Sequence, residues 1–110
     1  MIEIEINGFR WNVNFVKKND KELDGAWGIC LNYKQTILVC KDLHPQLIYE
    51  CLIHEITHAW LMTSGRGGKI KMETEEICEF MGFCGVGIIE KARSIMDNYW
   101  GSRHGKIRER

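Results

Sequence analysis

Residues 36–62 read TILVCKDLHPQLIYECLIHEITHAWLM, and the spacing of the hydrophobic residues changes within this stretch. Residues 36–41 form a short apolar run, which is typical of a buried strand. Pro45 is the only proline of the chain, and it suits the first turn of a helix. From Gln46 to Met62 the hydrophobic residues recur at 47, 48, 51, 52, 56, 59 and 62. This spacing predicts a helix of more than about four turns.

The residues before this stretch predict strands. Two segments alternate between apolar and polar residues, namely 2–6 and 9–16, and Asn7-Gly8 between them is a strong signal for a β-hairpin. Residues 26–33 predict a further strand, which a short turn at Lys34-Gln35 would join to 36–41. We therefore expect an antiparallel sheet of three to four strands, and the 36–41 strand is a candidate edge that could align an extended peptide.

The residues after the stretch predict a second helix, from Thr74 to about Tyr99. Its expected apolar face consists of Ile77, Phe80, Met81, Cys84, Ile88 and Ile95. Three glycines, Gly82, Gly85 and Gly87, weaken its middle and favour close helix packing or a kink. Polar segments at 17–25 and 64–69 predict loops. The sequence thus predicts a single α+β domain over residues 1–100, with the sheet first and two helices after it, and a basic flexible tail over 101–110.

Length and charge exclude several classes of protein. A chain of 110 residues has room for one hydrophobic core. Lys and Arg total 15, as do Asp and Glu, so attraction of the whole protein to nucleic acid is not expected. No apolar run approaches the length of a membrane span, and the N-terminus lacks the pattern of a secretory signal. The five cysteines include no C-x-x-C pair, which favours reduced thiols in a cytoplasmic protein.

Residues 54–58, His-Glu-Ile-Thr-His, form an H-E-x-x-H motif in the middle of the first predicted helix. A helix places His54 and His58 on the same face, so both imidazoles can bind one zinc ion. Glu55 is turned by about 100° from His54, which suits it to contact an attacking water rather than the metal. The motif therefore predicts a Zn²⁺ site with Glu55 as general base, the alternative being two ordinary helix histidines beside a chance acid.

A catalytic zinc ion needs a third protein ligand, for which the second helix offers several acids. Glu76 is the best candidate because it lies at the margin of the apolar face, about 85° from its centre. Glu75 and Glu79 lie about 175° and 145° from that centre and are expected to face solvent. Glu73 precedes Thr74, the expected N-cap. Acids in a first turn also oppose the helix dipole, which would explain Glu75 and Glu76 equally well.

The segments HEITHAWL (54–61) and EEICEF (75–80) together resemble the ImmA/IrrE family of small zinc metallopeptidases, over roughly residues 27–85. That family carries H-E-x-x-H and then a second helix of the form E-A-[DN]-x-F-A. Here the second pattern falls on residues 76–81, where the Glu and the Phe match and the Ala and Asp/Asn positions do not.

The resemblance implies a minimal zincin-like domain of the gluzincin type. It implies His54, His58 and Glu76 as zinc ligands, with Glu55 as general base. Many members attach a DNA-binding or sensory segment that has no counterpart here, and small versions resemble proteins of phages and mobile elements.

The predicted function is therefore that of a zinc metallopeptidase that hydrolyses a peptide bond in a specific protein substrate, without a membrane partner. One alternative is a catalytically silent zincin scaffold that binds a host protein. Another is nucleic-acid binding through the basic residues of the 64–69 loop and the tail, which the neutral net charge disfavours.

The sequence offers several further residues with more than one candidate role. The transition-state oxyanion needs a hydrogen-bond donor, for which Tyr33, Tyr99 and His104 are candidates among which the sequence does not choose. Cys51 lies on the same predicted helix face as His54, and we expect it to be core packing rather than a metal ligand. His44 is expected to cap the first helix or to lie on the surface.

Overall fold

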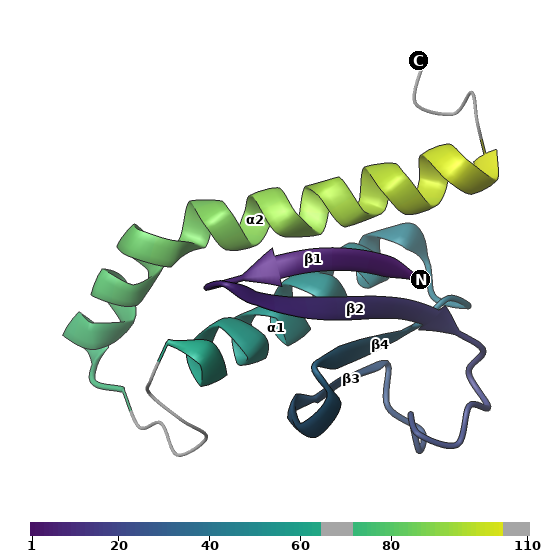
Figure 1. Ribbon diagram of the computed structural model, residues 1–110, viewed down its shortest axis with the longest axis horizontal. Helices are drawn as coiled ribbons and strands as arrows, with labels where there is room; N and C mark the ends of the chain where they lie inside the picture. The colour runs from purple at the N-terminus through teal and green to yellow at the C-terminus, as the bar shows by residue number, and fades with distance from the viewer. Residues whose placement is uncertain (65–71, 105–110) are drawn as a thin grey trace.

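The computed structural model describes residues 1–64 and 72–104, and of residues 102–104 it describes the backbone alone. Four strands precede two helices, which confirms the α+β class (Figure 1). Most of the predicted loop at 64–69 and residues 105–110 of the predicted tail lie outside the described residues. The strands are β1 (Ile2–Ile6), β2 (Phe9–Val16), β3 (Gly28–Leu31) and β4 (Thr36–Cys40); a 3-10 turn spans Asn32–Lys34, and the helices are α1 (Pro45–Thr63) and α2 (Thr74–His104).

The first two strands form the predicted hairpin. Asn7 and Gly8 have positive φ values of 51° and 86°, as a type I′ turn requires. The side chain of Asn7 also donates a hydrogen bond from Nδ2 to Oγ1 of Thr63, at 2.9 Å. The turn is therefore fixed locally by its own residues and held against the end of α1.

The sheet is mixed rather than antiparallel, which corrects the prediction. Its strand order is β1-β2-β4-β3, and β4 pairs with β2 in parallel. The 36–41 segment is consequently an interior strand, and the predicted role as an edge was wrong. All five residues of β4 are buried, whereas those of β3 are only half-buried. A strand that is apolar on both faces is best placed between two others, and this leaves β3 at the edge.

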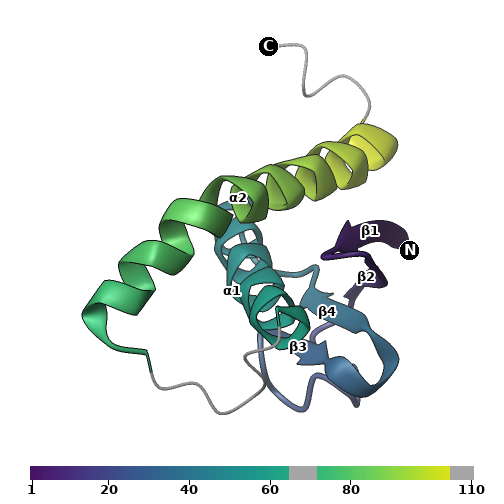
Figure 2. The ribbon, with the colours of Figure 1, turned by 60° about the vertical axis from the view of Figure 1, so that its left-hand side comes forward.

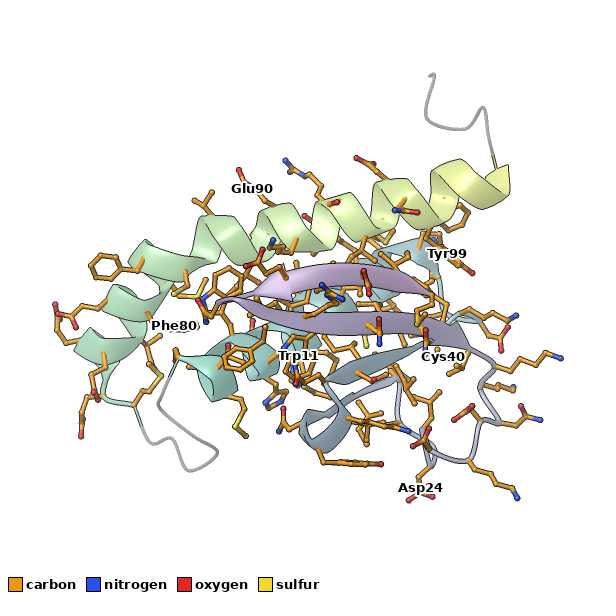
Figure 3. All side chains as sticks on the ribbon, viewed as in Figure 1. Trp11, Asp24, Cys40, Phe80, Glu90 and Tyr99 are labelled. Atoms are coloured by element: carbon orange, nitrogen blue, oxygen red, sulfur yellow. The ribbon has the colours of Figure 1, made fainter. Side chains whose placement is uncertain are left out.

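α1 lies across one face of the sheet, between the strands and α2 (Figure 2). Trp11, which Figure 3 labels in the interior, packs there with Val13 of β2 and with residues of β4. The helix contributes Ile48, Leu52, Ile56 and Ala59 to this core. The described part of the chain includes no helix apolar enough to cross a membrane.

α2 is longer than predicted and bends in its middle. It continues to His104, so residues 101–104 belong to the helix and not to a tail. Its second half runs beside β1, while its first turns diverge from that line (Figures 1 and 2). Phe80, Ile88 and Ile95 are buried as expected. Ile77 and Met81 are 48% and 50% exposed, so the predicted apolar face is only partly covered.

Candidate metal centre

α1 presents the two histidines of the motif on one exposed face. The ring centroids of His54 and His58 lie 4.9 Å apart, with the rings at 70° to each other. The helix begins at Pro45, and His44 caps it: Nδ1 of His44 accepts a hydrogen bond from the backbone N–H of Gln46 at 3.1 Å. The helical spacing predicted from the sequence therefore brings both imidazoles to the surface together, and His44 has the capping role expected of it.

Glu55 is buried, although it stands between two exposed histidines. Only 7% of its surface is accessible. Burial raises the pKa of the Glu55 carboxyl, and the nearby His54 and His58 partly offset this effect. A raised pKa makes the carboxylate a stronger proton acceptor, which is what a general base requires. Glu55 is thus suited to general acid–base chemistry beside the exposed imidazoles.

The start of β3 covers Glu55. A Cβ atom added at Gly28 would overlap Sγ of Cys51 and lie 3.3 Å from Cγ of Glu55. Only a residue without a side chain lets the strand approach α1 this closely. Gly28 therefore helps to exclude water from one side of the Glu55 carboxyl.

A cleft of about 380 Å³ opens between α1 and the beginning of β3. Its volume lies within the range of small-molecule and side-chain binding sites. Two carboxyl groups and one imidazole face into it from an otherwise largely apolar wall. The lining residues are Trp27, Gly28, Leu47, Glu50, Cys51, His54 and Glu55.

Glu76, the predicted third ligand, has a structural role at the start of α2. Its Oε1 accepts a hydrogen bond from the backbone N–H of Glu73 at 3.0 Å, as the acid of a capping box does. Thr74, expected as the N-cap, is the first helical residue instead. Among the described side chains, those of residues 1–64 and 72–101, no three His, Cys, Asp or Glu are grouped closely enough to hold a metal ion. The described geometry therefore fits two ligand positions of a zinc site and does not group a third with them.

The other candidates occupy separate parts of the molecule. Tyr33 is exposed on the 3-10 turn, and Tyr99 stacks on Phe15 with 3.9 Å between ring centroids. The side chain of His104 lies outside the description. Tyr99 thus contributes to packing between α2 and the sheet.

The cysteines are all free, and two of them lie near Glu55. Burial, followed by the charge of Glu55, raises the pKa of both the Cys30 and the Cys51 thiols to about 12. Cys51 belongs to the hydrophobic core, as expected, and stays a protonated thiol at neutral pH. Cys78 is exposed, whereas Cys40 and Cys51 are buried.

Sequence reasoning missed part of the cleft. Glu50 lies one helical turn before His54 on the same face, a spacing that could have identified it. Trp27 and Gly28 gave no comparable signal, because only the packing of β3 on α1 brings them to the motif.

No protein-family model, curated protein or solved structure shows significant similarity to this chain. Functional conclusions therefore depend on the chemistry of the residues themselves.

Proposed function

We propose that this chain is a zinc-dependent metallopeptidase in which His54 and His58 hold the zinc ion and Glu55 is the general base. The observation that carries the proposal is the pair of exposed imidazoles on α1, next to a buried carboxyl that lines a cleft. The resemblance of residues 54–61 and 75–80 to the ImmA/IrrE family supports the same reading and makes a specific protein, cleaved in the cytoplasm, the proposed substrate.

In the proposed reaction Glu55 moves a proton. When bound, zinc supplies a Lewis acid that polarises the scissile carbonyl and makes the attacking water more acidic. The Glu55 carboxylate accepts a proton from that water and returns it to the leaving amine. Burial raises the pKa of Glu55, which makes its carboxylate a stronger base for the first of these two proton transfers.

The free edge of β3 is the proposed guide for the substrate backbone. In the described sheet β3 pairs with β4 alone, so its outer N–H and C=O groups can bind an extended peptide. The start of this strand forms one wall of the cleft at Glu55. A peptide added to β3 would therefore pass close to the general base.

Glu76 is the proposed third ligand. Its carboxylate is a suitable ligand type, and it is half-buried on the inner margin of α2, as the sequence predicts. Oε1 of this carboxylate already accepts the hydrogen bond from the backbone N–H of Glu73.

Metal analysis tests this proposal first. We expect about one zinc ion per wild-type chain and much less in His58→Ala and Glu76→Ala, measured by mass spectrometry on proteins purified without added metal. Glu79→Ala is the matched control, because Glu79 is an exposed acid in the same part of α2. Zinc retained in Glu76→Ala would remove Glu76 from the ligand set.

Hydrolysis provides the second test. Zinc-loaded wild type should cleave members of a peptide library, and Glu55→Gln should bind zinc without cleaving. A wild-type chain that takes up no zinc even when it is supplied would overturn the proposal and favour a binding module without turnover.

A further inference from the structure

The cleft beside α1 carries chemistry that the proposed reaction does not use. Trp27, Leu47 and Glu50 line it but have no part in holding zinc or moving a proton. We infer that these three residues form a subsite for an arginine side chain of the substrate, an inference that rests on the proposed peptidase function.

The charges of the cleft favour a cation. Glu50 is exposed and forms no ion pair within the part of the chain that the structure describes. Glu55 adds a second carboxyl, and the described lining includes no Lys or Arg. A guanidinium can bind a carboxylate through two parallel hydrogen bonds, which gives it both affinity and direction.

The apolar part of the lining suits the rest of an arginine side chain. Trp27 is 57% exposed and lines the cleft, so its indole ring is accessible to a ligand there. An indole ring attracts cations to its face, and guanidinium groups stack on such rings more readily than ammonium groups bind there. Leu47 is half-buried and offers a surface for the methylene groups.

The subsite lies at a useful distance from the proposed reaction. Glu50 and His54 are four residues apart on α1, which corresponds to about 6 Å along the helix axis. Neighbouring residues of an extended peptide are about 3.3 Å apart. The arginine would therefore be adjacent, or next but one, to the bond that is cleaved.

Peptide binding tests the inference. The probes are acetyl-Ala-Ala-Arg-Ala-Ala-amide and the same peptide with citrulline, which has the shape of arginine without its charge. The wild-type chain is titrated with each peptide and followed by the NMR signals of the Trp27 indole and the Gly28 amide, while mass spectrometry reports whether the peptide stays intact. We expect the arginine peptide to bind about tenfold more tightly than the citrulline peptide.

Substitutions in the cleft show which residues are responsible for the preference for arginine. Glu50→Gln should abolish the preference for arginine, and Trp27→Ala should weaken binding of both peptides. Glu79→Gln, an exposed acid outside the cleft, should change neither. Equal affinities for the two peptides, or a preference that survives Glu50→Gln, would overturn the subsite.

The two proposals fail separately. If the arginine preference is found but zinc-loaded protein cleaves nothing, the cleft stands as an arginine-binding site and the peptidase proposal falls. If peptides are cleaved without regard to arginine, the peptidase proposal stands and the subsite falls.

Discussion

The two helices that carry the proposed zinc ligands differ in how much of their hydrophobic surface is buried. α1 lies between the sheet and α2 and contributes Leu52, Ile56 and Ala59 to the core with no exposed surface. The first half of α2, residues 74–86, buries Phe80 but exposes most of its other large hydrophobic residues, and Phe83 is 89% exposed.

This difference bears on how the proposed site would work. His54 and Glu55 are carried by a helix whose opposite face is packed in the core, so the backbone that presents them is held in place by that packing. Glu76 instead lies in the first turn of α2, where its Oε1 accepts a hydrogen bond from the backbone N–H of Glu73, the residue just before the helix. The helix that bears the two histidines is therefore held by the packed core, whereas the Glu76 carboxylate is engaged at the start of α2.

The largest expected effect concerns Glu55. Glu55→Gln should lower the rate of peptide hydrolysis by about 10²–10⁴-fold, the usual contribution of a general base. Zinc content should stay at the wild-type level, because Glu55 is not a proposed ligand. Initial rates on a cleaved library peptide provide the measurement, and unchanged rates would remove Glu55 from the mechanism.

Glu55→Gln should also change how the stability of the protein depends on pH. Because burial raises the pKa of Glu55 in the folded state, its contribution to stability is complete at low pH and is lost as the pH rises through that pKa. Gln does not titrate. Metal-free Glu55→Gln should therefore melt at a higher temperature than wild type at neutral pH, and this advantage should shrink as the pH falls. A constant difference between pH 4 and pH 8 would contradict the assigned cause.

Truncation of hydrophobic residues compares the two helices directly. Leu52→Ala in α1 should lower the free energy of unfolding by about 2–5 kcal/mol, because it leaves a cavity in the core. Ile77→Ala in α2 should change it by less than about 1 kcal/mol, because that side chain is half-exposed. Urea denaturation of the metal-free proteins measures both, and similar losses would show that the first half of α2 is packed as firmly as α1.

Two glycines of α2 form a matched pair for a smaller effect. A Cβ at Gly87 would lie 2.8 Å from the Trp60 ring of α1, whereas a Cβ at Gly82 would have no atom within 4 Å. Gly87→Ala should therefore cost about 1–3 kcal/mol by overpacking. Gly82→Ala should stabilise by about 0.5–1 kcal/mol, because alanine is the better helix former. Thermal melts of both variants would locate the boundary between the packed and the open parts of α2.

The smallest effect on the metal-free protein is expected at Glu76. Gln keeps an oxygen that can accept the hydrogen bond from the N–H of Glu73, so Glu76→Gln should change stability by less than about 1 kcal/mol. Zinc affinity should nevertheless fall, because the variant loses the charge of the proposed ligand. Competition with a zinc chelator measures this, and an affinity equal to wild type would leave Glu76 as a capping residue only.

Local signals predicted much of the fold. Asn7-Gly8 predicts a turn that needs positive φ at two successive residues, and both residues have positive φ in the structure. The apolar spacing between Gln46 and Met62 placed α1 to within a residue at each end. The parallel pairing of β2 with β4 was missed, because a connection through β3 gives no local sign of which strand will be central.

By itself, the sequence determined which segments are strands and helices, and it placed His54 and His58 on one face of α1. Both follow from interactions between near neighbours: backbone hydrogen bonds, turn conformation and helical spacing. Only the tertiary structure decided that Glu55 is buried, that Gly28 lies against it and that Trp27 and Glu50 share a cleft with it. These properties arise where β3 packs on α1, and burial and pKa depend on atoms brought together from distant parts of the chain.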